Sequence, residues 1–513
     1  MGKNFLRTII ILLIASISFT AFITPPVMST WMVGPVYEAL QFIGSEPRPV
    51  ESQHLRATEA FIVERLENAG LPVQVLEHHT TRSSQGNVTI RNIFAEIPGT
   101  SGKSVLFIAH YDSVLQGPGA MDNAAAVSTL LEVFIISAGQ LQHPEVGIQV
   151  LFTDGHEIGL GAHEFVRYHF DLVENTIFAF NFDGMGNGPL MPLQGGLRHS
   201  AMLFEAMGRP VGFSLLGYGA ALDEWHFAQA GIPAMGVMSL IRPWHYHSPS
   251  DTLSNLSAST VEVYIDTIYS LMGLASQGGW VEGFTPRDTT FFMLAYGLLI
   301  SYGPVVRWIL AGLMLAGILT MIFYRRSGSP YVPFSQGKWD VSVRGIIFSL
   351  IGLLLFIVLF VGGTMLFMML AANIWRGFVR YHTNIVLTSV VIVAVLVPLA
   401  YFYLKLLVGI GSWDSFGLVL SVLLGVAGVA AAVLAPGLEY FLLICAGLIA
   451  LRVSIPHNRV VYYFTGIAAG ILFLPLIFIL LTQLGVASFF TGGILALFIP
   501  VFYALTKDYP ASF

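Results

Sequence analysis

Histidine and acidic side chains gather in one part of the sequence, at positions where a metal ion could be bound. Twelve of the 14 histidines lie between His54 and His247, and the single cysteine, Cys445, lies far from them in an apolar run. Zinc at a catalytic site is commonly bound by imidazole nitrogens and carboxylate oxygens, without thiolate. The candidate residues are His110, Asp112, Asp122, Asp154, His156, Glu157, Asp183, His245, His247 and Asp251.

The segment TDGHEIGLGAH, residues 153–163, contains a His-Glu pair that allows two interpretations. A zincin helix has the pattern H-E-x-x-H, which would require a second histidine at position 160. The sequence has Leu160 there, and Gly159 and Gly161 would weaken the helix that the motif needs. His163 lies seven residues after the first histidine and is expected on the flank of any helix that begins here. The zincin interpretation therefore fails, and the pair belongs to another kind of metal site.

Short apolar runs rich in strand-forming residues alternate with helical segments around these candidates. Residues 104–112, 146–154 and 176–184 are predicted as strands that end in polar residues, and residues 122–139 as a helix between the first two. A further helix is predicted over residues 57–70, which end in a glycine. Strands that alternate with helices indicate an α/β fold with a mostly parallel mixed sheet flanked by helices, in which ligands gather at the carboxyl ends of the strands.

This topology predicts that three successive strands bring acidic or imidazole groups to one edge of the sheet. Asp122 opens the helix after the first strand and is expected to project over the same edge. A lone acidic residue at a strand end is more often a structural accident than a ligand, but several such residues at one edge favour a metal site. Two metal ions about 3.5 to 4 Å apart would need a carboxylate that bridges them.

Four sequence blocks resemble the co-catalytic zinc aminopeptidases, a group that also includes the glutaminyl cyclases and the transferrin-receptor ectodomain. The blocks lie within residues 100–255, and they hold five ligand positions in the order of the family: HYDSVLQGPGAMDNAAAVSTLLE, GHEIGLGAHEF, NFDGMG and YHSPSDT. An N-terminal anchor and a C-terminal region of several spans are similar to the branch of endoplasmic-reticulum metallopeptidases and vacuolar membrane proteases. The resemblance implies a zinc-dependent enzyme that hydrolyses the N-terminal peptide bond of a peptide.

Carried onto the matching positions, the resemblance implies a site for two zinc ions. The ligands would be His110 and Asp183 for one ion, Glu157 and His247 for the other, and Asp122 as the bridge. Asp112 would orient the His110 ring by accepting its second N–H, the usual role of a residue behind a metal ligand. The zinc ions would polarise the scissile carbonyl and lower the pKa of the attacking water.

The chain departs from this family at His156. The family has two consecutive glutamates there, the first a general base and the second a ligand, whereas this chain has His156 followed by Glu157. An imidazole beside two dications is expected to stay neutral, so His156 could take a proton from water as the catalytic base. Alternatively, because an imidazole places its nitrogen differently and has no second oxygen, the site binds metal without efficient turnover. The resemblance assigns no firm role to Asp251 or to the pair Asp223 and Glu224.

The sequence is too apolar for an ordinary soluble protein. Of its 513 residues, 55% are hydrophobic and 11% are charged, and the apolar excess lies mainly from residue 304 onward. The N-terminal run, with Lys3 and Arg7 before the two prolines at 25 and 26, is predicted as an uncleaved anchor rather than a cleaved signal peptide. Further spans are predicted at residues 304–324, 345–371, 385–404, 415–434, 438–452, 460–483 and 487–505.

Eight spans place both chain ends on one side of the membrane. If that side is cytoplasmic, the inner segments carry ten Lys and Arg residues, and the short outer loops carry only Arg376 and Arg380. The soluble module is therefore expected outside the cytoplasm, and the compact loops favour the periplasm of a bacterium over a eukaryotic lumen. A ninth span at residues 291–303 is rejected, because thirteen residues are too few to cross a bilayer.

The predicted organisation consists of four parts. They are an anchor at 1–26, an extracytoplasmic zinc peptidase domain at 35–285, a membrane-surface connector at 286–303, and an all-α polytopic membrane domain of about seven helices at 304–513. The expected partners are a peptide substrate and the lipid bilayer. A net charge of −6 without a basic cluster gives no argument for nucleic acid, and the oligomeric state is not indicated.

Two rival functions stay open. One is a glutaminyl-cyclase-like or purely metal-binding module, and the other is a transporter with an appended peptidase-like domain. Acidic residues after position 345 are few and lie near span ends, which favours a scaffold over ion coupling. A buried partner for Glu439 would favour a conduit instead.

Overall fold

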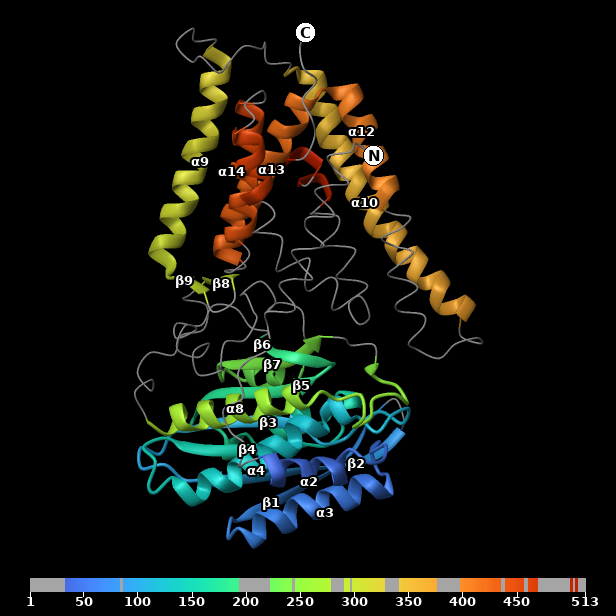
Figure 1. Cartoon of the computed structure of the whole chain (residues 1–513), viewed down its shortest axis with the longest axis vertical. Coiled ribbons are helices and arrows are strands. Elements are labelled where there is room, and N and C mark those ends of the chain that lie inside the picture. Colours follow the sequence, from blue (N-terminus) through green and yellow to red (C-terminus); the bar gives the residue numbers. More distant parts are fainter. Residues whose placement is uncertain are drawn as a thin grey trace. The chain divides into compact units, whose positions relative to one another are not determined.

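The chain divides into two units, with the boundary between Ser301 and Tyr302. The structure is a computed structural model (Figure 1). The predicted anchor at 1–26 lies outside the described residues, as do most of the predicted spans at 460–483 and 487–505. The structure describes residues 33–83, 86–192, 222–241, 245–277, 290–295, 298–327, 341–375, 397–434, 439–455, 460–468, 499–501 and 503–505.

Seven strands of the first unit pair into one mixed sheet, in the order β1-β2-β4-β3-β5-β7-β6 (Figure 1). The four central strands run parallel, and β1, β2 and β6 join antiparallel at the edges. The predicted α/β fold with a mixed sheet is thereby confirmed, with its parallel part at the centre. The strands are β1 Val73–Ser83, β2 Gly86–Ile97, β3 Ser104–His110, β4 Gly147–Thr153, β5 Thr176–Gly184, β6 Asn187–Pro192 and β7 Ala234–Ile241.

Helices cover both faces of this sheet, which explains why its central strands are apolar throughout. Every residue of β3 and β4 is buried, as expected for parallel strands that pack on both sides. Phe107 of β3 lies in the larger core, and its neighbour Leu106 lies in the smaller core on the opposite face. The larger core is formed with α2 Val33–Ile43, α3 Gln53–Asn68, α4 Ala125–Gln140 and α8 Ala258–Ser276, and the smaller with α5 Gly161–Tyr168 and α7 Asp223–Gln229.

The segment between β3 and β4 differs in one detail from its prediction as a helix that begins at Asp122. The regular helix α4 begins at Ala125, and an irregular turn, Ala120–Ala124, precedes it. Asp122 has φ −117° and ψ 82°, which are not helical angles. Gly119 starts this turn with φ +61°, and a Cβ there would lie 2.1 Å from the Asp122 carbonyl oxygen. The turn therefore depends on glycine and presents Asp122 from an irregular backbone.

The second unit consists mainly of apolar helices. Three helices among the described residues are long and apolar enough to cross a membrane: Ala120–Gln140, Val343–Phe360 and Trp413–Leu434. The first belongs to the sheet unit and is 89% buried there, so it is a core helix. Residues 291–303, the rejected ninth span, lie mostly in two paired strands, β8 Thr290–Ala295 and β9 Leu298–Tyr302. The helices of this unit are α9 Pro304–Ser327, α10 Val343–Trp375, α12 Val397–Gly411, α13 Trp413–Leu434 and α14 Glu439–Ser454.

Close packing accounts for the glycines in these helices. A Cβ on Gly428 of α13 would lie 2.7 Å from Leu443 Cγ of α14, and a Cβ on Gly417 would lie 2.4 Å from Val453 Cγ2. Small residues at such positions let helices approach each other closely in a membrane. The short predicted span at 438–452 corresponds to α14, which packs against α13 at these glycines.

Helix α14 has a buried charged residue near each end. Glu439 Oε1 lies 3.1 Å from Arg307 Nε of α9, and both side chains are almost fully buried. The guanidinium of Arg452 lies over the rings of Trp413 and Tyr462, at 5.6 and 5.1 Å from their centroids. Glu439 therefore has the buried partner that was expected to favour a conduit.

Within the sheet unit, Glu224 of α7 is a buried acid. It accepts a hydrogen bond from Asn181 Nδ2 at 2.9 Å, and Gly236 of β7 leaves the room that its carboxyl occupies. Burial raises the pKa of Glu224 to about 8. The carboxyl is therefore largely protonated at neutral pH in the folded chain.

Replacing Glu224 with glutamine should reduce the loss of stability at high pH. Because the folded-state pKa of about 8 exceeds the ordinary 4.5, this carboxyl stabilises the fold fully below about pH 4.5, and the contribution is lost as the pH rises through about 8. Between about pH 6 and pH 9, the melting temperature of the full chain should fall less in Glu224→Gln than in the wild type. Equal falls in the two proteins would contradict this assignment.

Candidate metal centre

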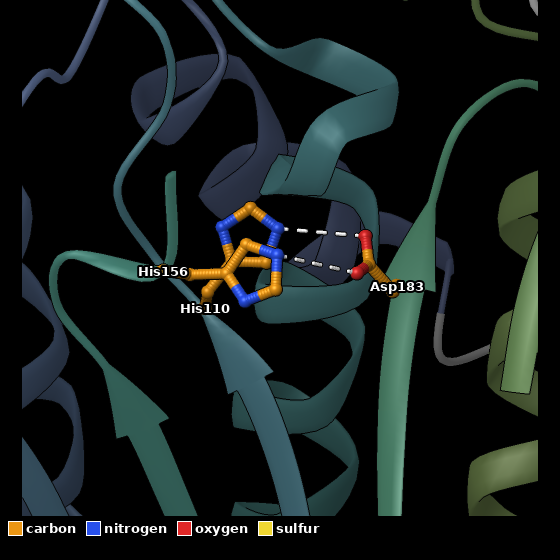
Figure 2. Close-up of side chains that lie close together, drawn as sticks. All are labelled: His110, His156 and Asp183. Carbon is orange, nitrogen blue, oxygen red and sulfur yellow. Dashed lines mark ion pairs between the residues drawn. The ribbon is translucent and has the colours of Figure 1, made fainter. Parts of the chain in front are cut away.

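Three neighbouring parallel strands end at the same edge of the sheet and carry the predicted site residues there. His110 is the last residue of β3, and it pairs in register with Thr153, the last residue of β4. Asp183 lies next to the end of β5, on the other side of β3. The predicted convergence of strand ends is therefore present, and Figure 2 shows the His110 and Asp183 side chains pointing toward one another.

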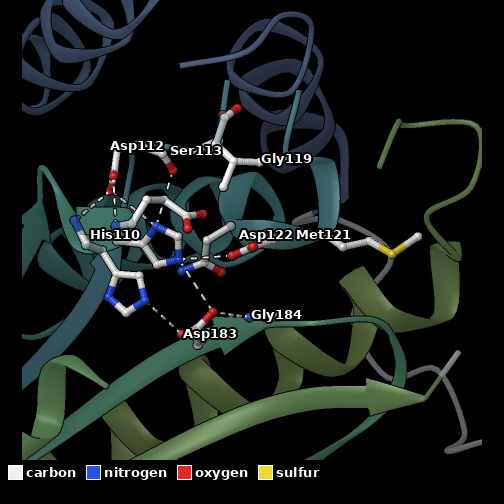
Figure 3. A network of polar contacts seen from close by, with 12 residues as sticks. His110, Asp112, Ser113, Gly119, Met121, Asp122, Asp183 and Gly184 are labelled. Atoms are coloured by element: carbon white, nitrogen blue, oxygen red, sulfur yellow. Dashed lines mark hydrogen bonds and ion pairs between the residues drawn. The ribbon is translucent and has the colours of Figure 1, made fainter. Parts of the chain in front are cut away.

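The Asp122 carboxylate lies beside the His110 imidazole (Figure 3), and the His247 imidazole lies at its other oxygen. Its Oδ1 is 3.1 Å from His110 Nε2, and its Oδ2 is 3.2 Å from His247 Nε2. Asp251 fixes the backbone behind it, because its two carboxylate oxygens accept the N–H groups of Met121 at 2.7 Å and Asp122 at 3.2 Å. The irregular turn before α4 is thus held so that each oxygen of Asp122 faces a different histidine.

Each of these histidines has a second carboxylate beside it. His110 Nε2 lies 3.4 Å from Asp183 Oδ1, and His247 Nε2 lies 3.0 Å from Glu157 Oε2. His247 has φ +55°, a left-handed backbone that a residue other than glycine seldom adopts. Such outliers gather at functional sites, where the surrounding structure holds them. All five residues proposed as ligands therefore come together as two His-carboxylate pairs, with Asp122 between them.

The donor atoms fit metal ions. Zinc ligands stand about 2.0 to 2.2 Å from the ion, so neighbouring ligand atoms of a tetrahedral site lie about 3.3 Å apart, close to the spacings given above. Within the described part of the chain, three buried atoms of this cluster lack a hydrogen-bond partner: His110 Nε2, Asp122 Oδ2 and Glu157 Oε1. Unpaired buried polar atoms are rare and need an explanation, which a bound ion supplies.

The charges at the site are strongly coupled. Burial opposes ionisation of Asp122, but His110 and His247 outweigh it and hold its pKa below the ordinary value. Burial would lower the pKa of His247, but Asp122 and Glu157 raise it to about 10. Without metal, these imidazoles therefore carry protons among the carboxylates. Metal binding would have to displace those protons, so metal affinity should rise with pH.

The turn that carries His156 and Glu157 is short and is not part of a long helix. It is a single 3-10 turn, His156–Ile158, between Gly155 at φ +77° and Gly159 at φ +73°. The Asp112 carboxylate accepts the N–H groups of His156 and Glu157, each at 3.1 Å. This geometry agrees with the rejection of the zincin motif, because both left-handed glycines end helical structure at once.

Asp112 also faces the His110 ring, as expected from the sequence. His110 Nδ1 lies 3.2 Å from the main-chain carbonyl oxygen of Asp112 and 3.4 Å from its carboxylate Oδ1. The carbonyl oxygen is the nearer acceptor for the Nδ1–H group. One residue therefore restrains both the His110 ring and the turn that begins at His156.

The His156 side chain points into the cluster. Its ring stacks on that of His110, with centroids 4.1 Å apart and planes 15° apart. Nδ1 lies 2.9 Å from Asp223 Oδ1, while Nε2 faces Asp183 Oδ2 at 3.7 Å (Figure 2). Without metal, burial would lower the pKa of His156, but the Asp223 and Asp183 carboxylates outweigh it and raise the pKa to about 9. The positive charge of bound metal ions would lower this pKa and favour the neutral ring.

Two residues that support the site were not found from the sequence. Arg48 is fully buried, and its guanidinium donates to main-chain carbonyls of the loop that leads to Asp122, including those of Tyr111 at 2.9 Å and Gly119 at 3.2 Å. The resemblance assigned no firm role to Asp223, and its contact with His156 was not anticipated. His245 contacts Ser250 Oγ instead, at 2.9 Å.

Comparison with known proteins identifies related sequences for the sheet unit. Residues 92–272 match the model of peptidase family M28. A vacuolar membrane protease of Schizophyllum commune is 27% identical over 167 residues, 30% of this chain and 18% of that protein. A probable lipoprotein aminopeptidase, LpqL, of Mycobacterium tuberculosis is 32% identical over 96 residues, 18% of this chain and 19% of that protein. The matches thus span less than a fifth of these two relatives.

Two solved structures are also similar to this chain. An aminopeptidase from Aneurinibacillus sp. strain AM-1 has 16% identity and a TM-score of 0.42, and covers 50% of this chain and 96% of its own. A glutaminyl cyclase of Fimbriiglobus ruber has 18% identity and a TM-score of 0.42, and covers 49% of this chain and 97% of its own.

Replacing Asp122 with asparagine should weaken metal binding more than loss of a single ligand would, because both His-carboxylate pairs face this carboxylate. Zinc retained by the purified full chain, measured by plasma mass spectrometry, should fall to roughly half or less of the wild-type value. The matched control is Asp154→Asn, which changes a buried aspartate that accepts the Arg91 N–H and lies outside both candidate metal groups. Equal zinc content in Asp122→Asn and wild type would contradict the site.

Proposed function

Because residues 92–272 are a domain of peptidase family M28, we propose that the chain is a membrane-anchored, zinc-dependent aminopeptidase that removes N-terminal residues from peptides. One observation carries the proposal, namely the Asp122 carboxylate between the His110-Asp183 pair and the His247-Glu157 pair. A carboxylate in such a position can bridge two metal ions.

Two zinc ions fit this arrangement best. His110 and Asp183 would hold one, His247 and Glu157 the other, and Asp122 would bridge them. When bound, the zinc ions supply Lewis-acid chemistry, which polarises a peptide carbonyl and makes water easier to deprotonate. Mixed nitrogen and oxygen ligands without thiolate support zinc at a site with an open position.

His156 is the residue that would carry a proton from the attacking water to the leaving amine. Its Nε2 faces the Asp183 carboxylate of the metal site, and its Nδ1 already contacts Asp223. In the proposed reaction, Nε2 accepts a proton from the water that attacks the carbonyl carbon. The same Nε2–H then gives that proton to the amine that leaves when the peptide C–N bond breaks. An imidazole can perform both steps because it gains and loses a proton at one atom.

The membrane arrangement is part of the proposal. It consists of an anchor at 1–26, a peptidase domain at 35–285 on the extracytoplasmic side, a connector at 286–303 and a membrane domain at 304–513. The apolar helices Val343–Phe360 and Trp413–Leu434 support a bilayer as partner, and the Lys and Arg asymmetry supports the sidedness. With this arrangement, the substrates are peptides outside the cytoplasm. In a bacterium, they would be peptides of the periplasm.

Transport is the second candidate function, and the buried ion pair of Arg307 and Glu439 favours it. Charged residues inside a membrane domain commonly mark ion or substrate paths. Both residues lie in the first turn of their helices, however, where a pair that pins α9 to α14 serves packing equally well. Flux into liposomes that survives Asp122→Asn would support transport, and flux that requires zinc would not.

The purified chain with zinc should hydrolyse aminoacyl anilides or short peptides, and His156→Ala should lower kcat by about a hundredfold or more. Zinc content should be unchanged in this variant, because all five proposed ligands remain. The matched control is His245→Ala, which removes an imidazole from the loop before His247 and should leave kcat near the wild-type value.

Two results would count against this function. Full activity in His156→Ala would rule out the histidine base while leaving the peptidase in place. A wild-type chain that binds zinc but turns over neither anilides nor peptides would be a metal-binding relative, and the aminopeptidase proposal would fail.

A further inference from the structure

The contact between His156 and Asp223 links the metal-centre turn to helix α7. We infer that Asp223 is a positioning residue, which holds the His156 ring with Nδ1 protonated and Nε2 facing the Asp183 carboxylate of the metal site. The inference rests on the proposed function of the site, since it concerns how the base is prepared for its task.

Both oxygens of Asp223 are in use, which fixes the carboxylate itself. Oδ1 lies 2.9 Å from His156 Nδ1, and Oδ2 accepts the hydroxyl of Thr153 at 2.5 Å. Asp223 is the first residue of α7 and is 4% exposed, while Thr153 is the last residue of β4. The carboxylate is therefore held between a strand end and a helix start, both of which are rigid elements of the fold.

This contact selects one form of the imidazole ring. An ionised carboxylate can only accept hydrogen bonds, so its partner Nδ1 must carry a hydrogen. In a neutral imidazole the other nitrogen, Nε2, then has the free lone pair. Nε2 is the nitrogen that faces Asp183 Oδ2, at 3.7 Å. Asp223 therefore leaves the lone pair on the side of the metal centre.

Stacking also keeps the ring from turning, because the His156 ring lies on the His110 ring with planes 15° apart. The main-chain N–H of His156 donates to Asp112 Oδ1 at 3.1 Å and so fixes the backbone from which the ring projects. A rotation about the side-chain bonds would have to break the Asp223 contact and the stacking together. The orientation is thus determined from three elements: β3, the turn after β4, and α7.

The stacking also argues against His156 as a ligand of the ion beside His110. The ligand atoms of His110, His156 and Asp183 lie within 4.8 Å of one another, so a shared ion is a real alternative. The lone pairs of imidazole nitrogens lie in the ring planes, however, and planes that are stacked and nearly parallel direct them side by side. They do not converge on one point, as tetrahedral coordination requires.

The need for Asp223 follows from the chemistry at position 156. A carboxylate base accepts a proton at either oxygen, whereas an imidazole accepts one only at the nitrogen that lacks a hydrogen. With the wrong tautomer, Nε2 would carry a hydrogen and could not take one from water. Asp223 removes this ambiguity before substrate arrives.

Asp223→Asn in the zinc-loaded full chain should lower kcat for an aminoacyl anilide about ten- to a hundredfold. Loss of a residue that orients a side chain of the metal site commonly has an effect of this size. The amide can donate to Nδ1 and so stabilise the wrong tautomer. KM and zinc content should be unchanged, and Asp223→Glu should restore part of kcat. The matched control is Glu224→Gln, the same change of acid to amide at the next residue, where the side chain bonds Asn181 instead; its kcat should stay near the wild-type value.

A second measurement does not depend on activity. The ¹⁵N chemical shifts of labelled histidines in the zinc-loaded full chain report which ring nitrogen carries hydrogen and which binds metal. The His156 signals are those that disappear in His156→Gln. The wild type should show hydrogen on Nδ1 and a free Nε2, and Asp223→Asn should show a population with hydrogen on Nε2.

Three results would overturn the inference. They are wild-type kcat in Asp223→Asn, loss of zinc from that variant, and a wild-type His156 with hydrogen on Nε2 or with Nε2 bound to zinc. The wild-type spectrum decides the question even if Asp223→Asn fails to fold. A wild type without hydrolysis but with the expected tautomer would sink the proposed function and leave the positioning role of Asp223 standing.

Discussion

The structure of this site depends on one electrostatic constraint: several acids are buried around a single point and cannot all be ionised unless positive charge lies among them. Asp122, Asp183 and Asp251 are each less than 5% exposed. Two kinds of positively charged group in the fold balance these buried carboxylates. Imidazoles face the carboxylates, and the Arg48 guanidinium lies buried behind the loop, where burial lowers its pKa to about 10 and still leaves it charged. Bound metal would add the rest.

This constraint explains why the site is built on the most rigid part of the fold. The ends of β3, β4 and β5 carry His110, the His156 turn and Asp183, and these strands are buried on both faces. A misplaced carboxylate here would be an unpaired buried charge, which costs several kcal/mol. Arg48 and Asp251 hold the connecting loop through main-chain groups. These main-chain contacts hold the loop without using the side chains of the proposed metal ligands.

The sequence predicted the central strands, the sheet edge and the residues that meet there, because strand ends and polar residues can be read from short-range patterns. It did not predict the partners of these residues. Arg48 belongs to no motif, and it donates to main-chain carbonyl groups, which every residue has. Asp223 contacts His156 although the two residues lie 67 positions apart in the sequence. The irregular backbone of Asp122 was also missed, since Ala-rich segments predict regular helix.

In the proposed metal centre, two ions flank Asp122, and His156 faces them without binding either. A crystal structure of the zinc-loaded full chain, with anomalous scattering recorded at the zinc edge, tests this most directly. The account predicts two zinc peaks about 3.5 to 4 Å apart on either side of the Asp122 carboxylate, neither within about 2.3 Å of His156 Nε2. A single peak bound by His110, His156 and Asp183 would contradict it.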